Sequence, residues 1–271
     1  MRKHITGFSN PTVKYLRSLR DKKHRKRSGQ FLVEGLRLLE DARSTGRLPT
    51  TLVMAEGRAA HDLLARLEAD VVAAGGEVIS TTPDILSKIT GKDNAQSVVG
   101  VFDEWDTSLA ALDRSAAPIW LVAQALRDPG NLGTMLRTGD AVGAGGLILI
   151  DDCADPFSAE AVRASMGAVF TVGLAQARWE EFLPWLRGGA KQDGGQLVAA
   201  SLRDAVPYRG AAYAAPCFIL VGNESQGLPE EYEAACDLRV TMPMKGRADS
   251  LNAAVAAAVL AYEVLAGLGC D

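Results

Sequence analysis

The chain has 271 residues and a net charge of −4, with 48% hydrophobic and 23% charged residues. This composition excludes a disordered chain and is typical of a globular protein with a substantial core. No apolar run reaches the roughly 18 to 20 residues that span a bilayer, and no signal-peptide core follows the first residues. We therefore expect a cytoplasmic protein of two domains that makes no contact with a membrane.

The cysteines and histidines do not suggest a metal site. The four cysteines are far apart, and no two of them form a Cys-x-x-Cys pair. We interpret them as reduced, structural residues. The histidines His4, His24 and His61 all belong to the N-terminal part of the chain and are interpreted as surface residues. The prediction is a protein without a metal.

Positive charge is concentrated at the start of the chain. Residues 1–27 contain ten lysines and arginines and one acid, a net charge of +9, so the remaining residues carry −13. A basic segment on an acidic body is typical of a protein that binds phosphates with one region. Val13, Leu16 and Leu19 have helical spacing, which predicts an amphipathic basic helix. A solvated basic helix without a partner is the alternative. The candidate phosphate-binding residues are Lys14, Arg17, Lys22, Lys23, Arg25, Lys26 and Arg27.

The next segment has the alternating pattern of a small αβ layered domain. Apolar periodicity predicts helices at 36–42, 63–73 and 85–89 and strands at 52–54, 78–80 and 98–102. Residues 105–117 have no strong sheet pattern and precede Pro118, which indicates a linker that is partly helical. The predicted organisation is a basic arm at 1–28, a small domain at 29–104, the linker at 105–117 and a second domain at 118–271.

The second domain is predicted to be α/β with a mostly parallel sheet. Apolar runs predict strands at 119–123, 147–150, 170–174, 197–200, 218–221 and 238–242. Helix-like segments separate most of these strands, as expected for a parallel sheet covered on both faces. Ligands of such sheets bind outside the carboxyl ends of the strands. Three polar segments follow strands and are therefore candidates for a site.

The first candidate segment, residues 126–137, leads from a strand into a helix. Pro129-Gly130 can form the turn, and Asn131 is expected to cap the helix. Arg137 lies nearly two helical turns beyond Asn131, so a direct contact would need a bent helix start or a ligand between them. The alternative is an ordinary capped helix with a surface arginine.

The second segment, residues 220–228, contains Gly222 and Gly227, which allow the main chain to wrap a ligand. Asn223 and Glu224 place an amide and a carboxylate in the same loop. The spacing is not the Gly-x-Gly-x-x-Gly pattern of dinucleotide-binding enzymes, and the phosphate-binding Gly-x-x-x-x-Gly-Lys-Ser/Thr pattern is also missing. The alternatives are an ordinary surface loop and a nucleotide-binding α/β enzyme.

The third segment, residues 242–252, precedes an alanine-rich helix. Asp249 or Ser250 is expected to cap this helix, with Asn252 in its first turn. The small side chains allow close packing against the chain's own sheet or against a second subunit.

Together, these three segments resemble the SpoU (TrmH-like) family of RNA ribose methyltransferases within the SPOUT superfamily, over residues 118–268. The resemblance implies a deep trefoil knot, a homodimer and S-adenosylmethionine as cofactor. It assigns the cofactor to Gly222, Asn223, Gly227, Met242 and Leu251. It assigns catalysis to Asn131, Arg137, Glu224, Ser250 and Asn252.

Details of the resemblance refine these expectations. Met242 stands where the family usually has isoleucine, and Ala253-Ala254 stand where Val-Ser is frequent. The segment Arg163–Ala168 also resembles a family segment near the site. An arginine is normally fixed as a cation with a pKa above about 12, so we interpret Arg137 as an electrostatic stabiliser rather than as a base.

The N-terminal part resembles the substrate-binding domain of many family members, in Phe31–Gly35 and the basic segment before it. This resemblance implies a ribosomal-protein-like RNA-binding fold. The predicted reaction is methyl transfer to a ribose 2′-hydroxyl of a structured RNA, with ribosomal RNA as the favoured partner. A tRNA substrate and a catalytically inactive ribosome-assembly factor are the alternatives.

Overall fold

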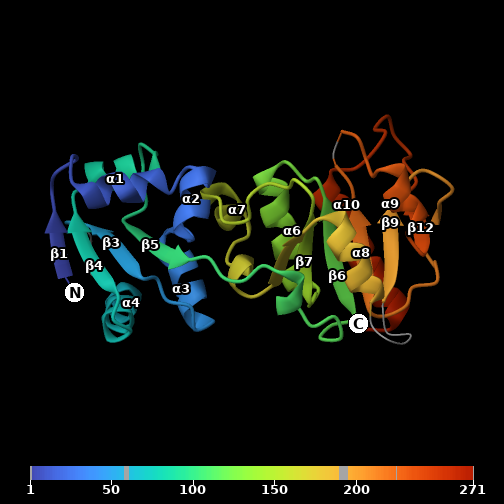
Figure 1. Ribbon diagram of the computed structural model, residues 1–271, viewed down its shortest axis with the longest axis horizontal. Helices are drawn as coiled ribbons and strands as arrows, with labels where there is room; N and C mark the ends of the chain where they lie inside the picture. Colours follow the sequence, from blue (N-terminus) through green and yellow to red (C-terminus); the bar gives the residue numbers. More distant parts are fainter. Residues whose placement is uncertain (1, 58–60, 189–194, 224, 271) are drawn as a thin grey trace. The chain divides into compact units, whose positions relative to one another are not determined.

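The computed structural model describes residues 2–57, 61–188, 195–223 and 225–270 (Figure 1). The chain forms two compact units. The first unit contains the residues up to Trp105 together with Asp155–Phe170, and the second contains Asp106–Ala154 and the residues from Thr171 onward. Among the described residues, no helix is both long and apolar enough to cross a membrane.

The first unit contains a mixed five-stranded sheet in the order β1-β4-β3-β5-β2. Strand β4 is parallel to β1 and β3, whereas β5 is antiparallel to β3 and β2. The strands are β1 (Arg2–Ile5), β2 (Gln30–Glu34), β3 (Thr51–Ala55), β4 (Glu77–Thr81) and β5 (Val98–Asp103). The helices are α1 (Pro11–Ser18), α2 (Lys22–Ser28), α3 (Leu36–Ser44), α4 (Asp62–Ala73), α5 (Pro83–Thr90) and α7 (Ala159–Ala164).

The basic arm contains β1 and two short helices rather than one helix. The Asn10 side chain caps α1 by accepting a hydrogen bond from Thr12 N at 2.8 Å, and the Asp21 side chain caps α2. Helix α2 ends at Gly29, whose φ of +64° is the left-handed conformation that glycine adopts without strain. The apolar stripe of α1 is buried with β3, β4 and α5, which confirms the amphipathic helix predicted from its spacing.

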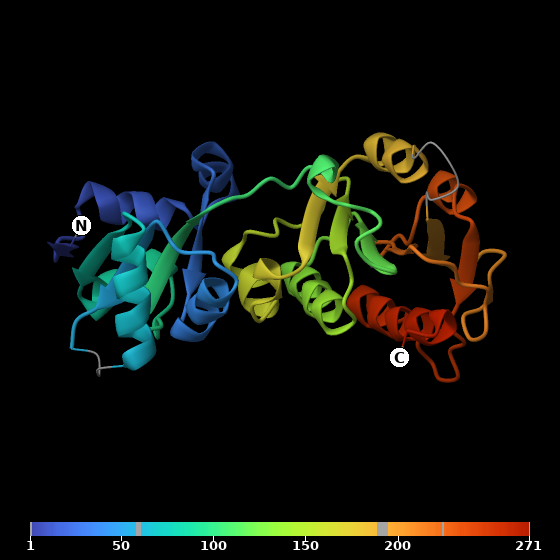
Figure 2. The ribbon, with the colours of Figure 1, turned by 90° about the horizontal axis from the view of Figure 1, so that it is seen from below.

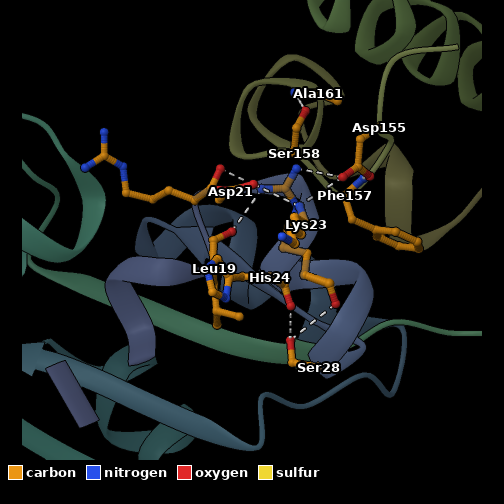
Figure 3. A network of polar contacts seen from close by, with 11 residues as sticks. Leu19, Asp21, Lys23, His24, Ser28, Asp155, Phe157, Ser158 and Ala161 are labelled. Atoms are coloured by element: carbon orange, nitrogen blue, oxygen red, sulfur yellow. Dashed lines mark hydrogen bonds and ion pairs between the residues drawn. The ribbon is translucent and has the colours of Figure 1, made fainter. Parts of the chain in front are cut away.

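Arg25 is buried inside the first unit, although its neighbours in the sequence are exposed. Its side chain donates to Asp155 Oδ2 from Nε at 3.1 Å and from Nη2 at 2.6 Å. Nη1 donates to the carbonyl oxygens of Leu19 and Arg20 at 2.9 and 2.8 Å. Figure 3 shows Asp155 within this network of polar contacts. Because its guanidinium forms these hydrogen bonds inside the unit, Arg25 is a structural residue. It is no longer a candidate RNA contact.

Segment 155–170 also completes an aromatic cluster of the first unit. The Phe157 ring lies 4.8 Å from the rings of Phe31 and Trp105, and the Phe170 ring lies 5.5 Å from that of Phe102. Because these contacts lie within the first unit, residues 155–170 are not part of a continuous second domain that begins at residue 118. The segment Arg163–Ala168 therefore belongs to the first unit, and its expected role near the site stays a prediction.

The second unit contains a seven-stranded sheet in the order β10-β12-β9-β11-β6-β7-β8, in which every pairing is parallel. The strands are β6 (Ile119–Gln124), β7 (Gly146–Ile150), β8 (Gly173–Ala177), β9 (Gln196–Ala200), β10 (Val206–Pro207), β11 (Cys217–Val221) and β12 (Leu238–Thr241). The helices are α6 (Pro129–Ala141), α8 (Trp179–Arg187), α9 (Glu230–Ala234) and α10 (Ala253–Leu268). The predicted parallel α/β fold is confirmed.

Helices cover both faces of this sheet. Helices α6 and α10 lie side by side on one face, and α8 lies on the other (Figure 2). Alternate strand residues form the core beneath α8 and α9, where the Trp120 and Phe218 rings stack at 5.5 Å. The strand predicted at 170–174 is wrong at its start. Ala168–Phe170 is a 3₁₀ turn of the first unit, and β8 begins only at Gly173.

The buried Arg25–Asp155 pair predicts a large effect of a single substitution. Asp155→Ala leaves the buried guanidinium without its carboxylate, a change that typically costs about 3–5 kcal/mol of unfolding free energy. The control is Asp152→Ala, which removes the exposed ion pair between Asp152 and Arg127 and should cost at most about 1 kcal/mol. Urea unfolding and hydrogen exchange of the α2 amides measure both effects. Equal destabilisation by the two substitutions would contradict the structural role of Arg25.

Candidate functional site

A cavity of about 410 Å³ opens at the carboxyl ends of β9, β11 and β12, next to the start of α10. This is the edge at which parallel sheets bind ligands. Six of the residues predicted from the sequence line it: Gly222, Asn223, Gly227, Met242, Ser250 and Leu251. The structure therefore brings the second and third candidate segments together. Glu224 lies outside the described residues.

The loop after β11 folds back on itself so tightly that one position must be glycine. Asn223 and Gly227 form an antiparallel bridge, and Gly227 has a φ of +68°. A Cβ atom at Gly222 would lie 2.5 Å from the carbonyl carbon of Gly227 and 2.7 Å from Leu228 N. Because these atoms are main chain, a larger residue would force the loop open. This segment, the glycine loop between Gly222 and Gly227, helps to line the cavity.

The Asn223 side chain fixes this loop and joins it to the end of β6. Its Oδ1 accepts hydrogen bonds from Ser225 N at 2.9 Å and Gln226 N at 3.1 Å. Its Nδ2 donates to the carbonyl oxygen of Ala125 at 2.9 Å. Ala125 has a φ of +48°, an uncommon conformation for a residue with a Cβ atom. The second candidate segment is therefore held to the turn that precedes the first.

Asn252 is the N-cap of α10 and connects the third segment to the first. Its Oδ1 accepts from Ala254 N at 3.0 Å and Val255 N at 3.2 Å, and its Nδ2 donates to Asn131 Oδ1 at 2.9 Å. The prediction that Asp249 or Ser250 caps this helix is wrong. Asn252 is the cap instead, because its side-chain oxygen accepts from two main-chain N–H groups. Its side-chain nitrogen remains free to donate to Asn131.

The cap of α6 also differs from the prediction. Asp128 is the N-cap and accepts from Asn131 N at 2.8 Å, while Pro129 is the first helical residue. Asn131 therefore lies inside the first turn and uses its side chain toward Asn252. Arg137 lies further along α6, is exposed, and is not among the residues that line the cavity. Within the described parts of the chain, no ion pair of Arg137 is found.

Sequence reasoning missed several polar residues of the cavity, among them Ser201, Arg203 and Glu233. Ser201 Oγ donates to Glu233 Oε1 at 2.6 Å, and Arg203 Nη1 lies 3.5 Å from Glu233 Oε2. Ser201 directly follows β9, so the carboxyl-end rule could have identified it. Glu233 gives no such signal, since it resembles the other acids of the short helix α9.

The buried cysteines are suited to packing rather than to chemistry. Burial raises the pKa of the Cys153 thiol to about 11 and those of Cys217 and Cys236 to about 12. These thiols therefore stay protonated at neutral pH and are poor nucleophiles. Among the described residues, no three His, Cys, Asp or Glu side chains are grouped so that they could hold a metal ion.

A parallel sheet with a cavity at the carboxyl ends of its strands defines an α/β protein of a ligand-binding class. The model of the SpoU rRNA Methylase family matches residues 118–262, and the model of the MRM3-like substrate binding domain matches residues 10–100. The chain belongs to the SpoU rRNA methylase family.

The similarity to known proteins extends over both units. The 23S rRNA (guanosine(2553)-2′-O)-methyltransferase of Bacillus subtilis is 31% identical over 97% of this chain and 99% of its own length. The AdoMet-bound rRNA methyltransferase from Sinorhizobium meliloti has a TM-score of 0.90 and 38% identity over 98% of both chains. The AdoMet complex of the SpoU methyltransferase AviRb from Streptomyces viridochromogenes has a TM-score of 0.85 and 27% identity, over 97% of this chain and 100% of that one.

The two functions of the Asn252 amide can be separated by substitution. Asn252→Ala removes the cap and should lower the unfolding free energy by about 0.5–2 kcal/mol. Asn252→Asp keeps the cap acceptors and adds a negative charge at the helix N-terminus, so it should preserve stability while losing the donor to Asn131. Urea unfolding measures the stability, and hydrogen exchange of the first-turn amides of α10 measures the cap. If both variants lose stability equally, the cap is not the stabilising element.

Proposed function

We propose that this protein transfers a methyl group from S-adenosylmethionine to a ribose 2′-hydroxyl of a structured RNA, with ribosomal RNA as the substrate. The observation that carries the proposal is the convergence of the glycine loop, Met242 and the Ser250–Leu251 segment on one cavity. Relatives similar over nearly the whole chain are named as rRNA methyltransferases, one of them as a 2′-O-methyltransferase. The proposal includes the family's deep trefoil knot, a ribosomal-protein-like fold for the first unit, and a cytoplasmic location.

The cavity suits a nucleoside cofactor that carries an activated methyl group. We expect main-chain groups of the glycine loop to hydrogen-bond the base, because Gly222 permits the tight loop and Gly227 adds no side chain to it. Met242 and Leu251 add apolar surface. When bound, S-adenosylmethionine supplies a methyl group on a sulfonium, so the protein needs to align the ribose oxygen and ease loss of its proton.

Arg137 is the residue we assign to the reacting hydroxyl. Its guanidinium is exposed and carries the fixed positive charge of an arginine side chain. A fixed cation can stabilise the alkoxide that forms as the hydroxyl loses its proton, and the substrate phosphate can accept that proton. Asn131 and Asn252 hold the start of α6, and with Ser250 they offer polar groups to the ribose. Glu224 completes this set as an orienting carboxylate.

A homodimer explains why Arg137 does not line the cavity of its own chain. Val255, Val259 and Tyr262 on α10 are 46%, 36% and 58% exposed. Their spacing of four and three residues places them on one face of the helix. An apolar helix face of this kind is suited to burial against a second copy. In the proposed dimer, Arg137 of one subunit reaches the cavity of the other.

The first unit supplies the RNA-binding surface. Lys14, Arg17 and Arg20 line a cavity of about 780 Å³ together with Lys88 and Lys92 near the end of α5. The exposed Lys22, Lys23, Lys26 and Arg27 extend the positive surface along α2. Such a surface binds the phosphate backbone, whereas the choice of nucleotide depends on RNA shape and unstacked bases.

Methyl transfer is tested with labelled S-adenosylmethionine and RNA from a strain that lacks the gene. We expect label in ribosomal RNA, recovered as an alkali-resistant dinucleotide because a 2′-O-methyl group blocks alkaline cleavage. Arg137→Ala should lower kcat by about 100-fold or more, the typical effect of removing one electrostatic contact to a forming oxyanion, and Arg137→Lys should keep part of the activity.

The matched control for Arg137 is Arg178→Ala, an exposed arginine at the start of α8, which should retain normal activity. Equal rates for Arg137→Lys and Arg137→Ala would argue against a simple charge effect. Label in transfer RNA would change the substrate assignment. A protein that binds RNA but transfers no label to either pool would be a binding factor.

The salt dependence of RNA binding tests the basic surface. Each phosphate contact to single-stranded RNA contributes about 0.7 to the slope of log K against log salt. The double variant Lys14→Ala/Arg17→Ala should therefore lower the slope by about 1.4, whereas Arg66→Ala/Arg178→Ala, with the same charge change elsewhere, should leave it almost unchanged. Filter binding at several salt concentrations gives both slopes. Equal changes for the two pairs would show that only net charge matters.

A further inference from the structure

One acidic side chain in the cavity has an oxygen that the protein itself does not satisfy. Glu233 is only 6% exposed and lies in α9, where its side chain lines the cavity. Its Oε1 accepts the short hydrogen bond from Ser201 Oγ. Its Oε2 is buried and, among the described residues, is the buried side-chain polar atom without a hydrogen bond.

Leaving a buried carboxylate oxygen unpaired is costly, because its hydration is lost without a replacement. Arg203 offsets this cost only in part. Its Nη1 is 3.5 Å from Oε2 without a hydrogen bond, and its side chain is 59% exposed, so solvent weakens the attraction. A buried acceptor without a hydrogen bond, on a residue that lines a ligand cavity, points to a donor on the ligand.

We propose that Glu233 Oε2 accepts a hydrogen bond from a ribose hydroxyl of the bound S-adenosylmethionine. This inference rests on the proposed function, because it needs that cofactor in this cavity. Apart from the adenine amino group, which the proposed function places with the base at the glycine loop, the cofactor offers two kinds of donor, the ribose hydroxyls and the ammonium of its methionine part. The Arg203 guanidinium beside Oε2 disfavours a second cation at this position, whereas it does not oppose a neutral hydroxyl.

The surrounding contacts hold the carboxylate ready for this bond. Ser201 Oγ donates to Oε1 and at the same time accepts from Arg203 N at 3.0 Å, which fixes the hydroxyl at the end of β9. The carboxylate therefore has one oxygen bonded to Ser201, whereas the other accepts no hydrogen bond from the described residues. A hydroxyl-to-carboxylate bond in a buried site is charge-assisted and stronger than a neutral hydrogen bond. Ser201 is thus a positioning residue for Glu233.

The test measures cofactor binding rather than turnover. Glu233→Gln keeps the side-chain size and an acceptor for Ser201 but removes the charge. We expect this variant to bind S-adenosylmethionine and S-adenosylhomocysteine about 10-fold or more weakly in isothermal titration calorimetry, as for loss of a hydrogen bond to a charged group. Glu230→Gln is the matched control. It lies on the same helix and 3.9 Å from the same Arg203 Nη1, but its side chain is 90% exposed, and its binding should change less than about 2-fold.

A second measurement identifies the donor on the cofactor. 5′-Methylthioadenosine, which lacks the ammonium, is compared with its 2′-deoxy and 3′-deoxy forms. In the wild-type protein, removing the contacted hydroxyl should weaken binding about 10-fold, whereas in Glu233→Gln the same removal should matter much less. If Glu233→Gln weakens only ligands that carry the ammonium, the hydroxyl assignment is overturned in favour of an ammonium contact.

The stability of the ligand-free protein separates this role from a purely structural one. Because Oε2 accepts no hydrogen bond from the described residues, Glu233→Gln should leave the urea midpoint unchanged or raise it while lowering affinity. A lower midpoint with no difference between the methylthioadenosine forms would overturn the inference. Failure of the wild-type protein to bind S-adenosylmethionine would overturn the proposed function as well, whereas normal binding by Glu233→Gln would overturn only the role of Glu233.

Discussion

The arrangement of the site depends on the side-chain amide of Asn252. An amide has a fixed polarity, and two main-chain N–H groups of α10 already occupy its oxygen. Its nitrogen must therefore face Asn131 in the first turn of α6, 121 residues earlier in the sequence. The Asn223 side chain holds the glycine loop in the same way. Its oxygen accepts a hydrogen bond from a main-chain N–H group of the loop, and its nitrogen donates to the carbonyl oxygen of Ala125. Two oriented amides thus hold three strand-end segments in register without a charge or a metal.

Local patterns predicted the elements well, because burial imposes a period on the sequence. The parallel strands β6, β9 and β11 are continuous apolar runs, as a sheet covered on both faces requires. The caps were misplaced for a related physical reason. Asp, Asn and Ser are all good N-caps, so Asp128 and Asn131, or Asp249 and Asn252, cannot be ranked without the path of the chain. The predicted cap of α6 therefore lay after the observed one in the sequence, and the predicted cap of α10 lay before it.

The division between the two units could not be predicted from periodicity. Arg25 has the composition of the basic arm around it, and only its distant partner Asp155 distinguishes it. A buried ion pair separated by 130 residues leaves no local pattern, and neither does the insertion of Phe157 among the aromatic rings of the first unit. The sequence alone therefore assigns residues 155–170 to the second domain, and only their contacts place them in the first unit.

The two walls of the cavity differ in how far their chemistry can be read from the sequence. The glycine loop restricts its own sequence, because any side chain at Gly222 would collide with the main chain of the loop. This restriction can be seen in the sequence as a glycine. Glu233 is constrained by the ligand instead, and its unpaired oxygen costs stability in the free protein. A cost of about 1–3 kcal/mol is tolerable against a typical folding stability of about 5–15 kcal/mol. A binding group of this kind becomes evident only when the hydrogen bonds of the folded chain are counted and one acceptor is left over.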